Sequence, residues 1–328
     1  MQLIHFRNSV PNFGDDLNVD LWPAFVPELF ADSSVDRGFC GIGTIIGMNT
    51  DVTQLDIFSS GAGYLHVDLW AKKRITVHCV RGPLTAKLMG VGPELALGDG
   101  AITVPLAPAF PDRGTGGGGT VVIPHFETIA YPGWAEACAQ AGFTLIDPRG
   151  TPAEVIGAIA RADLVLTESL HGAILADVYG VPWIAFGCSR NLSTSKWVDW
   201  LATLSLDFST TLVPPPNAAQ LLRFGKRAEP FGTTLTFTLD EAMREYAGRM
   251  NQIEKTGYGP PGGPKAWVKS VVAAVPPLQR LLGYSPARTA EALTALAARP
   301  TSLSQEARRD SLRDRMMEKL YALDRSMR

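Results

Sequence analysis

Three basic side chains stand at expected helix starts. His171 follows a β-rich run, Arg81 directly precedes a Gly-Pro pair, and Lys196 follows three helix-capping residues. A helix N-terminus carries roughly half a positive charge, so basic residues are disfavoured there. Their repeated presence predicts one shared anionic ligand, bound also by free backbone N–H groups. Taken singly, each has a simpler interpretation as a structural histidine, a surface arginine or a solvated cap residue.

Residues at the end of an apolar run and in two turns are weaker candidates. His125 ends the run "TVVIPH" and is expected to be a supporting hydrogen-bond donor. In "NFGDD", Gly14 is expected to make a turn, and Asp15 or Asp16 to cap a helix. Asp15 is also a candidate base or hydroxyl ligand. Asp99, in "LGDGAI", has its simpler interpretation as part of a turn at the end of a strand or helix, and its alternative role is to face the cleft.

The elements that must position these residues alternate between strand and helix. Residues 1–112 contain three short apolar runs that end at glycine or a polar break, and a helix is expected after "NFG". This pattern predicts an N-terminal α/β domain with a parallel sheet. Four consecutive glycines then predict a linker over residues 113–119, or a flexible loop. No Gly-Lys-Ser/Thr follows them, which excludes a P-loop.

A second α/β unit is predicted over residues 120–250. Its centre is the strand–helix–strand stretch "ADLVLTESLHGAILADVYGVPWIAF", which contains His171. The two units predict Rossmann-like domains that face each other across a cleft, where ligands meet strand ends and helix starts. Residues 251–328 are predicted to form a loop, "TGYGPPGGPK", and a helical C-terminal extension.

Composition excludes several classes of protein. The chain has 328 residues, of which 46% are hydrophobic and 19% charged, and its net charge is −2. These values are typical of a folded enzyme and give no field that would attract nucleic acid. Its four cysteines and five histidines form no zinc motif. No signal peptide or membrane span is recognisable, so a cytoplasmic protein with reduced thiols is expected.

The last predicted helix has two interpretations. Leu312, Met316, Leu320 and Leu323 recur at helical spacing among charged residues. The simpler interpretation is a helix that packs on its own domain or on a partner subunit. The other is a peripheral helix on the inner face of the cell membrane, which would bring the protein to a lipid-linked substrate. The sequence indicates no oligomeric state.

The order of motifs resembles that of the polysaccharide pyruvyl transferases, especially the succinoglycan-type ketal-pyruvyl transferases. "NFGDDLN", "VRGPLTAKL", "GDGAI", "VVIPH", the stretch around "ESLHG" and "SKWVDWL" carry the resemblance over roughly residues 1–205. It implies a GT-B-like fold. It also implies transfer of the pyruvyl group of phosphoenolpyruvate to two hydroxyls of a sugar, which gives a cyclic ketal. Many relatives have Arg-Leu-His where this chain has Ser169-Leu170-His171, which removes one anion contact.

These expectations assign a role to each candidate. His171 would protonate the vinyl carbon of the donor as general acid, with Asp15 as base. Arg81 and Lys196 would bind the carboxylate and phosphate of the donor. The substrate-binding set is completed by His125, Ser169, Gly14 and Asp99. Neither a metal nor another cofactor is expected, and the expected acceptor is a lipid-linked saccharide.

Two other functions fit the same sequence. A GT-B glycosyltransferase would use a nucleotide sugar in the same cleft. A non-catalytic carbohydrate-binding protein of polysaccharide assembly would bind sugar without releasing phosphate from phosphoenolpyruvate. The basic helix starts argue against the second, because a neutral glycan does not need them. The sequence does not identify the acceptor sugar, its hydroxyl pair or the stereochemistry of the ketal.

Overall fold

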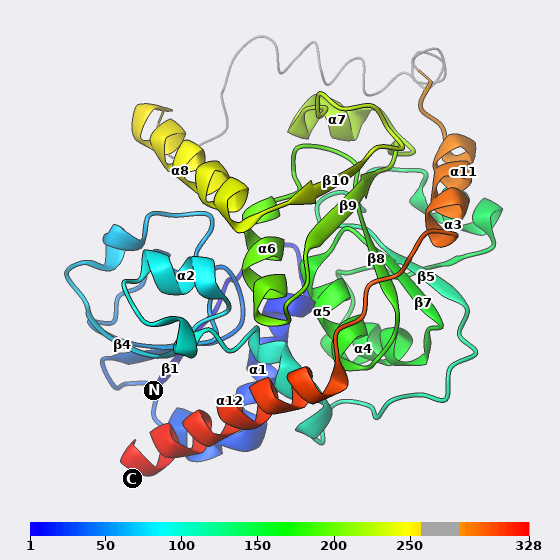
Figure 1. The fold of residues 1–328 in the computed structure, drawn as a ribbon. Coiled ribbons are helices and arrows are strands. Elements are labelled where there is room, and N and C mark those ends of the chain that lie inside the picture. The colour runs from blue at the N-terminus through cyan, green and yellow to red at the C-terminus, as the bar shows by residue number, and fades with distance from the viewer. Residues whose placement is uncertain (257–282, 328) are drawn as a thin grey trace.

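The computed structural model describes residues 1–256 and 283–327, which form two β-sheets surrounded by helices (Figure 1). The first sheet is parallel, and its strands in spatial order are β1 (Gln2–Ile4), β2 (Arg37–Cys40), β3 (Gln54–Phe58) and β4 (Arg74–Cys79). The strands of the second sheet are β5 (Thr120–Ile123), β6 (Thr144–Leu145), β7 (Leu164–Thr167), β8 (Trp183–Gly187), β9 (Phe208–Leu212) and β10 (Thr234–Phe237). The expected α/β class is confirmed.

The spatial order of the second sheet is β10-β9-β8-β7-β5-β6, and only β10 runs antiparallel. The chain moves outward from β5 to β6 and then returns to place β7 on the other side of β5. The order therefore reverses between β5 and β7. Ligands of parallel α/β sheets bind at the carboxyl ends of the strands at such a reversal.

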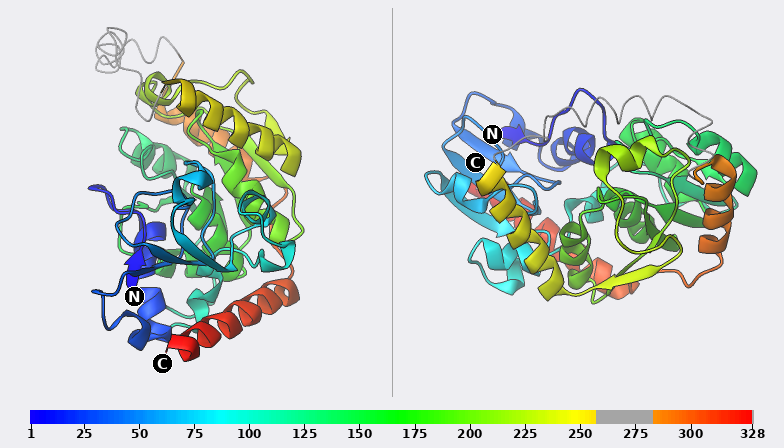
Figure 2. Two further views of the ribbon diagram at one scale, coloured as in Figure 1. Left: turned by 90° about the vertical axis from the view of Figure 1, so that its left-hand side faces the viewer. Right: turned by 90° about the horizontal axis from the view of Figure 1, so that it is seen from above.

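The helices pack around both sheets (Figures 1 and 2). They are α1 (Phe13–Phe25), α2 (Pro83–Leu88), α3 (Trp134–Ala141), α4 (Pro152–Arg161), α5 (Leu170–Val178), α6 (Thr194–Thr203), α7 (Ala219–Phe224), α8 (Leu239–Thr256), α11 (Pro286–Ala297) and α12 (Glu306–Met327), with a 3₁₀ helix η4 (Gly100–Leu106). Helix α8 contacts both α6 and α2, so it touches elements that flank the two different sheets.

Local sequence explains several helix boundaries. Thr151 and Glu154 form a reciprocal capping box at the start of α4, with Pro152 as its first residue. One expectation about α1 is wrong. Gly14 does not make the turn before the helix but is its second residue, and the N-cap is Asn12. Asp15 and Asp16 therefore lie in the first turn instead of capping the helix, and Asp16 accepts a hydrogen bond from the backbone N–H of Asn12 at 3.0 Å.

The largest hydrophobic cluster includes residues that flank both sheets. Phe13 and Leu17 from α1 belong to it together with Ile174 from α5 and Trp197 from α6. The glycine-rich segment connects the two sheets along the chain and lies against the end of α4. There the backbone N–H groups of Gly117 and Gly119 donate to Asp163 at 2.8 and 2.9 Å. The expected division into two domains at residues 113–119 stays a prediction.

Helix α12 packs on the protein itself. Its apolar residues Leu312, Met316, Leu320 and Leu323 are buried in the largest core cluster. Figure 1 shows this helix running under both halves. The simpler interpretation of the C-terminal segment is therefore confirmed, and the apolar face that a membrane-surface helix would need is not exposed.

Within residues 1–256 and 283–327, no helix is both long and apolar enough to cross a lipid bilayer. Most of the loop predicted at residues 256–265 lies outside the described residues.

Candidate active site

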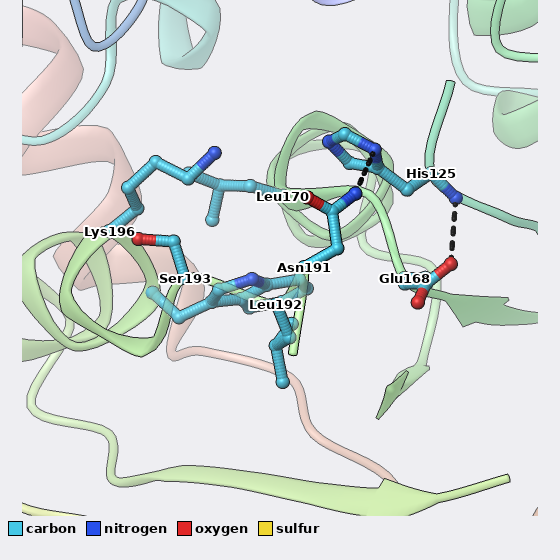
Figure 3. A pocket seen from close by; sticks show the side chains of 8 residues that line it. His125, Glu168, Leu170, Asn191, Leu192, Ser193 and Lys196 are labelled. Carbon is cyan, nitrogen blue, oxygen red and sulfur yellow. Dashed lines mark hydrogen bonds between the residues drawn. The ribbon is translucent and has the colours of Figure 1, made fainter. Parts of the chain in front are cut away.

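A pocket opens where the strand order of the second sheet reverses. It is lined by His125, Glu168, Leu170, Asn191, Leu192, Ser193, Lys196 and Trp197 (Figure 3). His125 lies just beyond β5, and Glu168 directly follows β7. The remaining residues belong to the start of α5, the loop after β8 and the first turn of α6. Two predicted site residues, His125 and Lys196, are thus brought together at the predicted edge of the sheet.

His125 is a neutral hydrogen-bond donor in this pocket. Its Nδ1 lies 3.1 Å from the Nδ2 of Asn191 and accepts from the backbone N–H of Glu127 at 3.4 Å. Both neighbours are donors, so Nδ1 must be the acceptor and Nε2 must carry the proton. Burial, with a smaller effect of the nearby charge of Lys196, lowers the pKa of His125 to about 3. Figure 3 shows the free ring nitrogen on the side that faces Lys196.

Glu168 holds the strand ends together. This buried carboxylate accepts from Thr128 Oγ1 at 2.6 Å and from the backbone N–H groups of Cys188 at 3.1 Å and His125 at 3.2 Å. Burial raises its pKa, and the three hydrogen bonds oppose this. Glu168 therefore fixes the position of His125 relative to β7 and β8.

Lys196 extends from the first turn of α6 into the pocket. Its ammonium group donates to the hydroxyl of Tyr64 and lies 4.6 Å from the centre of that ring. The sequence predicted free backbone N–H groups at this helix start, but in the structure they are occupied. Those of Thr194 and Ser195 donate to the carboxylate of Glu245 from α8. At this helix the side chain of Lys196, rather than the backbone, is left for a ligand.

His171 forms a second centre beside the pocket. Its Nε2 lies 3.8 Å from Asp99 Oδ2, and both atoms are buried without a hydrogen-bond partner. The other carboxylate oxygen of Asp99 caps η4 by accepting from Ala101 N at 3.0 Å. On the opposite side, the ring packs so tightly on Gly14 that a methyl group there would lie 1.9 Å from Nδ1.

Asp15 belongs to the same centre. Burial raises its pKa, while the charges of His171 and Lys196 and a hydrogen bond from Asn12 lower it in part. The hydrogen bond from Asn12 Nδ2 measures 2.6 Å. A buried carboxylate with a raised pKa binds a proton more readily than an exposed one. The group of His171, Asp99, Asp15 and Gly14 therefore has the components of an acid–base centre.

Arg81 is not placed as the sequence suggested. It is 1% exposed, does not line the pocket, and donates to Asp199 on α6 at 3.2 Å. Two further donors of the guanidinium bond to Thr44 Oγ1 at 2.7 Å and to Ala62 O at 3.2 Å. Because Asp199 also accepts from Thr85, this buried ion pair joins α2 and β4 to α6. Arg81 is therefore a structural link between the two halves of the protein, each of which contains one sheet and its helices.

Ser169 is the N-cap of α5 and accepts from Gly172 N at 3.3 Å, so its hydroxyl is already used within the protein. Sequence reasoning missed Glu168, Asn191 and Tyr64. For Glu168 a signal existed, because a carboxylate directly follows a predicted strand. For Asn191 and Tyr64 the signal was absent, since both lie in loops.

The described part of the chain contains no group of three or more His, Cys, Asp or Glu side chains that could hold a metal ion. The expectation that the reaction needs no metal stays a prediction.

Comparison with known proteins gives two matches. A family model for polysaccharide pyruvyl transferase matches residues 56–190. This span runs from β3 to just beyond β8 and contains Asp99, His125 and His171. The succinoglycan biosynthesis protein ExoV of Rhizobium meliloti (strain 1021) is 35% identical over 236 residues. That alignment covers 69% of this chain and 72% of ExoV.

Proposed function

The chain belongs to the polysaccharide pyruvyl transferase family, and from this premise we propose that it transfers the pyruvyl group of phosphoenolpyruvate to a saccharide. The acceptor would be a lipid-linked precursor of an exopolysaccharide. Two of its hydroxyls would form a cyclic pyruvate ketal, with release of phosphate. The likeness to a succinoglycan biosynthesis protein supports an acceptor of this class.

One observation carries the proposal. Lys196 and the neutral His125 line the same pocket, at the strand reversal and beside His171. The donor has a carboxylate and a phosphate close together and needs a cation and N–H donors within one small site. Lys196 supplies the charge and His125 Nε2 supplies a donor. The GT-B-like arrangement of two domains would place the acceptor against the open side of this pocket.

The reaction needs one acid and one base. A first sugar hydroxyl attacks C2 of phosphoenolpyruvate, and its proton passes to a base. C3 takes a proton from the acid and becomes a methyl group. The C–O bond to phosphate then breaks as the second hydroxyl attacks C2, and its proton leaves with the phosphate. The products are the ketal and inorganic phosphate, so atoms and charge balance.

His171 is the proposed acid and Asp15 the proposed base. Because His171 Nε2 is buried and faces Asp99, the carboxylate of Asp99 stabilises a proton on Nε2 and orients the ring. Nδ1 is then the nitrogen that exchanges its proton with the substrate. Gly14 permits this position of the ring, because any side chain there would collide with Nδ1. The raised pKa of Asp15 favours its acceptance of a hydroxyl proton.

Phosphate release tests this proposal. The protein is incubated with phosphoenolpyruvate and a panel of lipid-linked oligosaccharides. A thermal-shift series compares phosphoenolpyruvate with UDP- and GDP-sugars, since stabilisation by a nucleotide sugar alone would point to a glycosyltransferase. Lys196→Ala removes a charge-assisted contact of about 1.5–3 kcal/mol and should raise the KM for phosphoenolpyruvate ten- to a hundredfold. Lys226→Ala, which removes an exposed lysine, is the control. An unchanged KM for phosphoenolpyruvate in Lys196→Ala would contradict the binding of the donor in this pocket.

A further inference from the structure

Tyr64 is an exposed tyrosine that touches a residue of the pocket. Lys196 lines the pocket, and its ammonium group contacts the hydroxyl of Tyr64. Tyr64 belongs to the loop that follows β3, so it comes from the first sheet, whereas the pocket is built on the second. Tyr64 therefore brings an aromatic ring of the first half of the chain next to a lysine that lines the pocket.

Two of the few exposed aromatic rings follow strands of the first sheet. Among the described residues, the strongly exposed aromatic side chains are Phe6 (39%), Tyr64 (42%) and Tyr321 (42%). Phe6 follows β1 and Tyr64 follows β3, and these parallel strands end at the same edge of the sheet. Phe6 lies two residues beyond the end of β1, and Tyr64 lies six residues beyond the end of β3, so both rings belong to loops that leave this edge.

The ring of Tyr64 is held in place although it is exposed. Arg249 of α8 donates to Gly63 O at 3.2 Å, and its guanidinium lies 5.4 Å from the ring centre. Tyr246 donates to Leu65 O at 3.2 Å, which fixes the other side of the loop. An ordered aromatic side chain that remains accessible costs little entropy when it binds a ligand. Isolated exposed hydrophobic residues are common, but a rigid ring at the mouth of a pocket is typical of a binding site.

We propose that Tyr64 and Phe6 form an acceptor subsite for a neutral saccharide chain, with Tyr64 under the sugar that reacts and Phe6 under a neighbouring sugar. The C–H face of a pyranose carries a slight positive charge and packs on the negative face of an aromatic ring. The position of Tyr64 beside Lys196 assigns it the ring next to the donor. This inference rests on the proposed function, since it takes the donor to occupy the pocket.

The test separates the ring of Tyr64 from its hydroxyl. Tyr64→Ala should raise the KM for the acceptor about three- to tenfold, the worth of one stacking contact, and leave the thermal shift with phosphoenolpyruvate unchanged. Tyr64→Phe keeps the ring and should retain the wild-type acceptor KM. Tyr321→Ala, an equally exposed tyrosine on α12, is the matched control. Phe6→Ala should raise the KM for an oligosaccharide acceptor but not for its terminal sugar alone.

Two outcomes would overturn the subsite. One is a Tyr64→Ala enzyme whose KM for the acceptor equals that of Tyr321→Ala. The other is a Tyr64→Phe enzyme with weakened donor binding and an unchanged acceptor KM, which would show that the tyrosine serves only Lys196. Saturation-transfer NMR with cello-oligosaccharides and galacto-oligosaccharides measures saccharide binding without any turnover. Loss of their signals in Tyr64→Ala supports the subsite even if no phosphate is released, whereas absence of binding to the wild type contradicts it.

Discussion

Replacing Gly14 by alanine tests whether His171 works through Nδ1. The added methyl group would lie 1.9 Å from Nδ1 and 2.3 Å from Cγ of His171. Ordinary contact begins near 3.4 Å, so the ring would have to move by about 1.5 Å. A catalytic group displaced by about 1 Å can lose on the order of 10²-fold in rate. We therefore expect kcat to fall about a hundredfold or more, as measured by phosphate release at saturating donor and acceptor.

Gly248→Ala is the matched control. Gly248 also lies within a helix, and a methyl group there would meet nothing within 4 Å. Both substitutions gain up to ~1 kcal/mol of helix propensity, so this gain cannot explain a difference between them. Circular dichroism and thermal melting establish that Gly14→Ala is folded. A folded Gly14→Ala enzyme with the kcat of the wild type would refute the proposed role of Nδ1.

Three further substitutions test the site and its support. His171→Asn should lower kcat by ~10²–10⁴ and change donor binding little, as steady-state phosphate release measures. Arg81→Ala leaves its carboxylate partner buried without a counter-charge and should lower the free energy of unfolding by ~3–5 kcal/mol in denaturant titrations. Burial raises the pKa of Asp56, but hydrogen bonds from Arg37 and His78 outweigh this and hold it below its ordinary value. The contribution of ionised Asp56 to the free energy of unfolding should be complete above the pKa that Asp56 has in the unfolded chain. It should be lost as the pH falls through the lower pKa of the folded state, and Asp56→Asn should abolish this pH dependence of stability.

Much of the fold could be predicted because short apolar runs, glycine breaks and capping residues are local signals. The stretch around His171 shows this well, since Ser169 caps a helix between two buried strands. The convergence of His125 and Lys196 was also predictable, because both follow the carboxyl ends of strands in a parallel sheet.

The error about Arg81 has a different origin. Its position before Gly82-Pro83 is the same in sequence whether the guanidinium meets a ligand or Asp199, which lies 118 residues further along the chain. Long-range pairing of this kind leaves no local pattern. The same holds for Glu245, whose carboxylate takes the backbone N–H groups at the start of α6. Charge at a helix start indicates that an anion is near but does not tell a ligand from a side chain of the same protein.

The two centres differ in what they require from the fold. The pocket proposed for the donor is built wholly from residues that follow strands of the second sheet. The acid–base centre instead joins His171 on α5 to Gly14 and Asp15 on α1 and to Asp99 before η4. A small change in the relative position of the two halves would alter the 3.8 Å separation of His171 and Asp99 and leave the pocket unchanged. Donor binding and proton transfer should therefore respond separately to the buried link between Arg81 and Asp199. Weakening that link is expected to affect kcat before it affects the KM for phosphoenolpyruvate.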